Sequence, residues 1–127
     1  MERKNSIEEI VKEFDRNMKG GEIIALVVFD RDGRLIACAV QDEAAGEFLS
    51  VIGGGLLSMT EKVLDSMDMN PLDRTIIETT RGNILLENLG KEFGIILIAS
   101  PGVSIGRARM MLKGVVQKLK GISGISL

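Results

Sequence analysis

The chain has 127 residues, a formal net charge of −2 and 45% hydrophobic residues, which suits a single domain with an ordinary core. Its slight acidity and its four aromatic residues, all phenylalanine, argue against nucleic acid as a partner, because duplex binding needs a basic face and single-strand binding needs rings that stack on bases. Histidine is absent and Cys38 is the only cysteine, so the sequence lacks the commonest general base and metal ligand, and we expect no catalytic residue, metal or cofactor.

The first predicted element is a helix that begins at a capping box made by Ser6 and Glu9 and ends at Gly20 and Gly21. The residues before it are charged and lack the apolar core of a secretory signal. No apolar run in the chain reaches the roughly 20 residues that cross a bilayer, and a lone cysteine fits a reducing compartment. We therefore expect a cytoplasmic protein without stable membrane insertion.

The rest of the chain alternates between apolar runs and turn signals. Strands are expected at 23–29, 35–40, 75–79, 83–89 and 93–99, with further helices at 43–67 and 104–120. Hairpin-length connections make the sheet mostly antiparallel, and the first strand is apolar on both faces. The sequence therefore predicts an α/β three-layer sandwich with a five-stranded sheet, in the order α-β-β-α-β-β-β-α. This single domain spans 1–120 and is followed by a short tail, 121–127.

The long central helix contains Gly53, Gly54 and Gly55, although each glycine costs roughly 1 kcal/mol in a helix interior. A phosphate-binding loop is a poor explanation, because no Gly-Lys pair follows and no strand leads directly into the glycines. Close approach of another backbone is the better explanation, since glycine has no Cβ to prevent it.

A helical wheel at roughly 100° per residue divides this helix into faces. One apolar stripe is expected to pack on the sheet, and consists of Ala45, Phe48, Leu49, Ile52, Leu56, Met59, Val63 and Met67. A second stripe begins with small residues and ends with leucines, a pattern typical of a close helix crossing; it consists of Gly46, Ser50, Gly53, Leu57, Thr60 and Leu64. We expect the second stripe to contact an element outside the domain. The alternatives are deeper burial inside the monomer, or a helix broken at the glycines.

Other clusters of polar residues have simpler interpretations. Asp30, Asp32 and Gly33 lack the spaced ligands of a calcium loop and predict a hairpin turn. The strand glutamates are expected to be solvated. The last helix is basic, and an ordinary surface helix is favoured over one that lies on a membrane or receives an acidic partner; its cations are Arg107, Arg109, Lys113, Lys118 and Lys120.

Four segments together resemble the Roadblock family, named for dynein light chains. They are the hairpin VVFDRDGRLIACAV, the small-residue helix, the second hairpin RTIIETTRGNILLENLG, and FGIILIASPGVSIGRARMMLKGVV. The resemblance runs from about Ser6 to Lys120 and implies the profilin-like Roadblock fold. It also implies dimers that join through the small-residue stripe of the long helix and edge to edge through the third strand, whose residues are Thr75, Ile76, Ile77, Glu78 and Thr79.

Family members are non-catalytic platforms that bind and regulate small Ras-like GTPases or join motor and signalling assemblies. The resemblance therefore implies a homodimer, or a heterodimer with a Roadblock paralogue, whose further partner is a small Ras-like GTPase. Arg31, Arg34 and Arg81 are expected at turns, from which an arginine finger could reach outward, and nothing in the sequence selects one of them. The alternative is a sensor domain in which the glycines make room for a small ligand; an enzyme has the least support.

Overall fold

The computed structural model describes residues 2–17, 20–40 and 43–122. Its elements follow one another in the predicted order α-β-β-α-β-β-β-α. They are α1 (Glu2–Asn17), β1 (Ile23–Asp30), β2 (Leu35–Ala39), α2 (Glu43–Ser66), β3 (Thr75–Thr79), β4 (Gly82–Leu89), β5 (Phe93–Ala99) and α3 (Ile105–Lys120). Most of the predicted tail, 123–127, lies outside the described residues.

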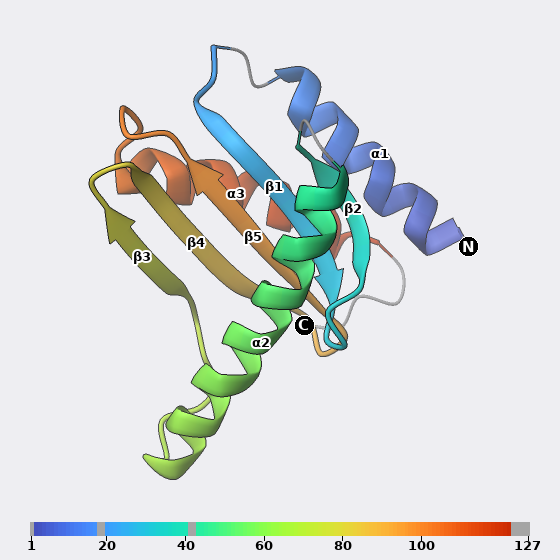
Figure 1. Ribbon diagram of the computed structural model, residues 1–127. Coiled ribbons are helices and arrows are strands. Elements are labelled where there is room, and N and C mark those ends of the chain that lie inside the picture. The colour runs from blue at the N-terminus through green and yellow to red at the C-terminus, as the bar shows by residue number, and fades with distance from the viewer. Residues whose placement is uncertain (1, 18–19, 41–42, 123–127) are drawn as a thin grey trace.

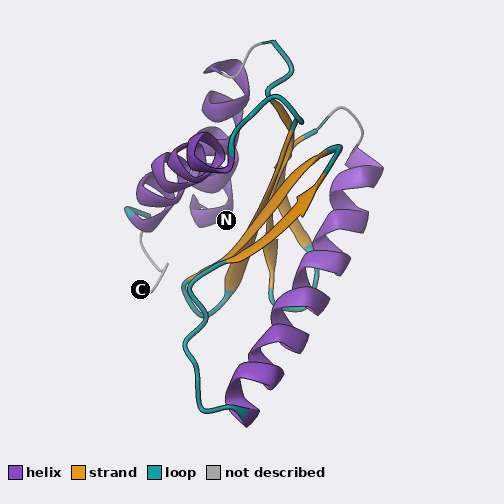
Figure 2. Ribbon diagram, turned by 90° about the vertical axis from the view of Figure 1, so that its left-hand side faces the viewer, coloured by secondary structure: helices purple, strands orange, loops and turns teal. Residues whose placement is uncertain are grey.

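The five strands form one antiparallel sheet in the spatial order β2-β1-β5-β4-β3, shown in Figure 1. Figure 2 shows that α1 and α3 cover one face of the sheet and that α2 crosses the other. The predicted three-layer sandwich is therefore confirmed. β1 and β5 lie in the centre of the sheet, and β2 and β3 form its two edges.

Each face of the sheet has its own apolar core, because successive side chains of a strand point to opposite faces. Leu26 and Val28 of β1 join the cluster beneath α1 and α3, whereas Val27 and Phe29 join the cluster beneath α2. This double burial explains why β1 is apolar at consecutive positions instead of alternating with polar residues.

The starts of α1 and α3 differ in how they are capped. The capping box at Ser6 is wrong, because α1 already begins at Glu2 and Ser6 lies within the helix. Ser104 does cap α3, where its side chain accepts a hydrogen bond from the backbone N–H of Arg107 at 3.1 Å. Within the described ranges, no helix is both long enough and apolar enough to cross a bilayer.

Candidate interaction surface

The small-residue stripe of α2 packs on the protein's own sheet. Gly46, Ser50, Gly53 and Leu57 are all buried, and Leu57 has no exposed surface. The buried Ser50 hydroxyl donates a hydrogen bond to the backbone oxygen of Gly46 at 2.8 Å, so it needs no partner from another chain. The prediction that this stripe contacts a second chain is thus corrected at these four positions. Of its two remaining members, Thr60 and Leu64 are half-buried.

The glycines bring α2 close to the strands beneath it. A Cβ on Gly53 would lie 2.7 Å from two atoms of the Phe29 ring, and one on Gly46 would lie 2.9 Å from Sγ of Cys38. A Cβ on Gly54 would lie 3.2 Å from Cα of Gly33, in the turn between β1 and β2. The space that these glycines leave is already filled by the protein, so it does not form the ligand cavity that a sensor would need.

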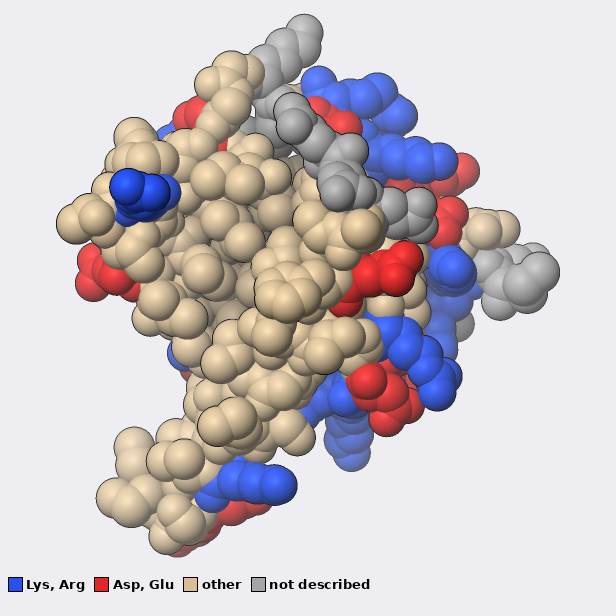
Figure 3. Space-filling model, viewed as in Figure 1, with Lys and Arg blue, Asp and Glu red and all other residues tan. Residues whose placement is uncertain are grey.

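The opposite face of α2 is apolar and exposed. The predicted sheet-packing stripe is therefore largely wrong, since Phe48 is 65% exposed and Val63 is 60% exposed. The outer face of α2, as we call it, comprises Phe48, Val51, Ile52, Met59 and Val63 of the helix, together with Met67 directly after its last residue. Figure 3 views the molecule from this side, and the surface around α2 and over the neighbouring sheet is mostly uncharged. A contiguous apolar face of this kind marks an interaction surface, whereas single exposed apolar residues do not.

Gly55 belongs to this outer face. It is exposed, and nothing described lies within 4 Å of the position that its Cβ would take. The glycine triplet is therefore divided between two faces, with Gly53 and Gly54 toward the sheet and Gly55 toward the outside. No contact within the described chain explains the third glycine.

β3 provides an open backbone beside the outer face of α2. Among the described residues it pairs with β4 only, so its other edge keeps N–H and C=O groups that no described strand pairs with. Ile76 is 39% exposed on this strand. Figure 1 shows the C-terminal end of α2 extending past the sheet on the side of β3. The structure therefore brings the two elements predicted to form an interface, α2 and β3, to one side of the molecule.

Arg31 is turned inward, contrary to the expectation that it reaches out from its turn. Its guanidinium pairs with the carboxylate of Glu61 on α2 and donates to the side-chain oxygen of Asn88 on β4. Its backbone N–H donates a hydrogen bond to the backbone carbonyl oxygen of Glu92 at 3.0 Å. Arg34 and Arg81 are exposed, as expected. The ion pair links residues 30 positions apart, and neither local sequence pattern reveals it.

A second ion pair joins α3 to the start of β1. Nε of Arg107 lies 2.7 Å from one carboxylate oxygen of Glu22, and Nη2 lies 2.9 Å from the other. This bidentate hydrogen bond lowers the pKa of Glu22 below its usual range, and the nearby charge of Arg107 adds to the effect. Among the described residues, no group of three or more acidic or cysteine side chains could hold a metal ion.

Comparisons with known proteins agree with this architecture. The model of the Roadblock/LC7 domain matches residues 7–99. An uncharacterised protein of Aquifex aeolicus (strain VF5) is 27% identical over 122 residues, which cover 94% of this chain and 74% of the relative. MglB of Myxococcus xanthus superposes with a TM-score of 0.83 at 16% identity, covering 96% of this chain and 90% of that chain. The gliding protein MglB of Thermus thermophilus superposes with a TM-score of 0.77 at 13% identity, covering 95% and 90%. The identities to these two structures show a shared fold alone, but the domain match extends over most of the sequence. The chain belongs to the Roadblock/LC7 family.

Proposed function

We propose that this protein is a non-catalytic platform that forms a homodimer, or a heterodimer with a Roadblock paralogue, and in that form binds and modulates a small Ras-like GTPase. The observation that carries the proposal is the apolar outer face of α2 beside the open edge of β3. A contiguous apolar face next to an unpaired strand suits a second copy of the chain, because one contact buries both features.

Pairing of β3 with its copy would continue the sheet across a twofold axis. Self-complementary contacts of this kind are the commonest way in which soluble proteins form oligomers. An added strand gains main-chain hydrogen bonds along the edge. The five β3 residues of the predicted interface, Thr75 to Thr79, therefore stay in the proposed contact.

On α2, the proposed contact moves to the outer face. Leu57 and the buried small residues are unavailable to another chain, whereas Phe48 and Val63 are exposed. Gly55 lies between them along the helix and would let a second helix backbone approach closely. The exposed methionines at positions 59 and 67 add flexible side chains that adapt to a facing surface.

The membership in the Roadblock/LC7 family supports the GTPase as the further partner. Family members serve as regulatory domains and not as enzymes, and a dimer would offer a twofold surface of the same kind. A regulator of this type acts by ordering the switch segments of the GTPase or by supplying an arginine, and Arg34 and Arg81 are the exposed turn arginines.

The first test is the absolute mass in solution by light scattering after size exclusion. We expect the parent at twice 13.8 kDa and Val63→Arg at 13.8 kDa, because a charge in the outer face of α2 opposes burial. Ser58→Arg adds the same charge at an exposed polar position of α2 and should leave the dimer intact. A parent that is monomeric at micromolar concentration would contradict the proposed homodimer and leave the heterodimer with a paralogue as the form to test.

The second test concerns the partner. Single-turnover GTP hydrolysis and nucleotide release are measured for small Ras-like GTPases of the source organism, with and without the parent protein. We expect one of them to change its rate, and we expect Val63→Arg to abolish that change if the dimer is the binding form. An intact dimer that alters no rate and binds none of these GTPases would leave a dimerisation module without the proposed regulatory role.

A further inference from the structure

A small cleft with a positive lining lies between α3 and the residue directly before β3. Its volume is about 240 Å³. The residues that line it are Arg74, Gly106, Arg109, Met110 and Lys113, and we call it the cationic cleft. Three of these five residues are cations and none is acidic, so the cleft is a positively charged recess.

The place of Arg74 follows from the alternation of side chains in the sheet. Glu87 lies between Leu85 and Leu89 of β4, which belong to the core beneath α1 and α3, so its side chain points to the same side. Nε of Arg74 donates a hydrogen bond to a carboxylate oxygen of Glu87 at 3.1 Å. Arg74 is thereby held on the α3 side of the sheet, and its side chain is 22% exposed.

The carboxylates near Arg74 leave the cleft itself positive. Besides Glu87, Asp73 lies close to Arg74, with Oδ2 at 3.7 Å from Nη1. Both acidic residues line a neighbouring pocket and not the cationic cleft. They face Nε and Nη1 of the guanidinium, so within the described chain Nη2 keeps its donors for a ligand.

The cations of α3 divide into two groups. Arg107 and Lys118 each pair with a glutamate elsewhere in the chain. Arg109 and Lys113 are exposed, and neither forms a hydrogen bond or ion pair with any residue that the structure describes. They stand four positions apart, so they share one side of a helix that contains no acidic residue, and they repel each other. An anion in the cleft would relieve this repulsion.

Exposed apolar side chains stand beside these cations. Met110 lines the cleft and is 75% exposed. Ile76 of β3 is 39% exposed and stands opposite Leu85, so it points to the same side of the sheet as Arg74. A free anion would use the cations and leave these apolar side chains in water. A peptide segment can contact both kinds of side chain.

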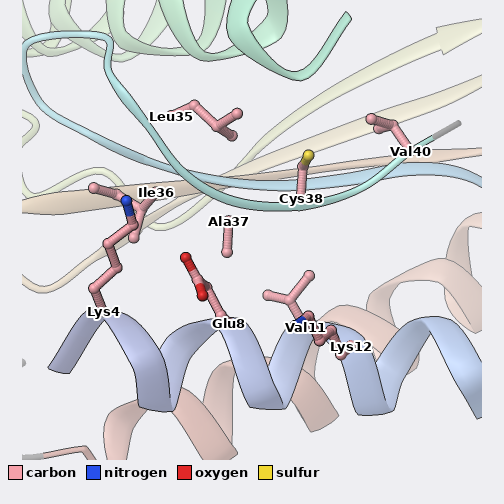
Figure 4. Close-up of a pocket in the computed structure, with 9 residues that line it drawn as sticks. All are labelled: Lys4, Glu8, Val11, Lys12, Leu35, Ile36, Ala37, Cys38 and Val40. Carbon is pink, nitrogen blue, oxygen red and sulfur yellow. The ribbon is translucent and has the colours of Figure 1, made fainter. Parts of the chain in front are cut away.

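The groove in Figure 4 offers a comparison within the same protein. It runs between α1 and β2 and has a volume of about 440 Å³. Figure 4 shows Glu8 between Lys4 and Lys12 along α1, so charges of both signs line this groove. A mixed row of this kind favours no single sign of charge, whereas the cationic cleft favours a negative one.

We propose that the cationic cleft binds an acidic segment of a partner protein. One carboxylate of the segment lies between Arg74 and Arg109, and a second lies against Lys113. Four residues of α-helix rise about 6 Å, which matches the roughly 6.7 Å between alternate side chains of an extended chain. An apolar side chain that follows the two acidic ones packs on Met110. The proposed dimer buries the outer face of α2 on the other side of the sheet, so this inference stands independently of it.

The number of cations argues against a lipid surface or nucleic acid as the occupant. Lipid surfaces are bound by clusters of about four to eight basic residues, and nucleic acids by contacts to many phosphates. Three cations line the cleft, and the chain as a whole has a net charge of −2. This charge suits two carboxylates of a protein segment.

The test is a titration of the isotope-labelled full chain with the peptide acetyl-Ser-Glu-Ser-Glu-Ser-Leu-Ser-amide, followed by NMR shifts of the backbone amides. A second peptide has glutamine in place of both glutamates, and a third has serine in place of leucine. We expect the first peptide to bind most tightly and to shift the amides from Gly106 to Lys113. The glutamine peptide should lose binding, and the serine peptide should bind more weakly.

Charge variants make the test specific. The double variant Arg109→Glu, Lys113→Glu should weaken the first peptide by about fivefold or more, because two attractions become repulsions. The matched control Lys4→Glu, Lys12→Glu makes the same change in net charge at two exposed lysines of the other groove. It should leave the affinity nearly unchanged, because salt screens distant charges. Circular dichroism confirms that each variant is folded.

Two further variants separate the apolar contact and the dimer from the charges. Met110→Ser should weaken the leucine peptide and leave the serine peptide unaffected, since only the first has an apolar side chain to lose contact. Val63→Arg, the variant designed to be monomeric, should bind the first peptide as the parent does. Loss of binding in Val63→Arg would contradict a cleft that is complete in one chain.

Three other results would overturn the proposal. The first is equal affinity of the parent for the glutamate and glutamine peptides. The second is a folded α3 double variant that keeps the affinity of the parent. The third is displacement of the peptide by an equal concentration of inorganic phosphate, which would mean that the cleft binds a free anion instead of a protein segment.

Discussion

Phe29 shows how one ring depends on the absence of two side chains. The ring is fully buried, and a Cβ on Gly94 would lie 2.5 Å from it, a separation similar to that for Gly53. The ring is thus enclosed by glycine from α2 above and from β5 beside it. Side-chain volume, and not hydrophobicity, decides which residues are tolerated at these two positions.

We expect Gly53→Ala to lower the free energy of unfolding by about 1–2 kcal/mol, because the added Cβ overpacks Phe29 by more than the gain in helix propensity offsets. Gly114→Ala is the matched control. Nothing described lies within 4 Å of its new Cβ on α3, so it should raise the free energy of unfolding by about 0.5–1 kcal/mol. Urea unfolding at one protein concentration measures both. Stabilisation by both variants would show that Phe29 yields to the new methyl group.

Glu22 gives a prediction on pH dependence. Its pKa is lower in the folded protein than in the unfolded chain, so its contribution to stability is present above the unfolded pKa and is lost as the pH falls through the folded pKa. Glu22→Gln should therefore lose less unfolding free energy than the parent between about pH 6 and pH 3. Urea unfolding at several pH values checks this. An identical pH dependence of parent and variant would contradict a role for the Arg107 pair.

At the scale of elements, α2 is held, within the part of the chain that the structure describes, by contacts on one face and by one ion pair at its side. Arg31 and Glu61 are 27% and 29% exposed, so their ion pair is partly shielded from water. The pair joins α2 to the turn between β1 and β2, the same turn that Gly54 approaches. The turn and the helix are therefore expected to move together.

We expect Glu61→Gln to loosen this turn, because Arg31 would keep its charge and lose the facing carboxylate. Hydrogen exchange of the backbone amides at Asp32 to Arg34 should become faster. Glu47→Gln changes an exposed glutamate of the same helix and should leave those amides unchanged. Equal exchange rates in both variants would show that glycine packing alone fixes the turn.

At the scale of the whole molecule, the sequence was sufficient for the architecture and insufficient for the orientation of one helix. Apolar runs and turn signals are local, and they predicted the order of the elements and the antiparallel sheet. The face of α2 that packs on the sheet was predicted from the apolar character of its side chains alone, and this places Phe48 and Val63 inward. The structure places them outward. The inner face of α2 lies so close to Phe29 that it leaves no room for a Cβ at Gly53, and glycine therefore stands on that face.

The features of the candidate surfaces also fall into those that the sequence predicted and those that it did not. The resemblance to the Roadblock family implied that the third strand lies at an edge of the sheet, and β3 is an edge strand. The pairing of Arg31 with Glu61 and the cationic cleft beside α3 depend on packing between distant segments, which no local pattern encodes. These features emerge only from the three-dimensional arrangement of the chain.

The two faces of α2 also differ in how freely they can change over evolution. A substitution at Gly53 disturbs the core, so the inner face is constrained by the fold itself. A substitution at Val63 or Met59 leaves the core intact and alters mainly what the helix presents to another molecule. Gene duplicates of this protein can therefore diverge in their choice of partner while they keep the same core, and a self-associating ancestor can give rise to paralogues that pair only with each other.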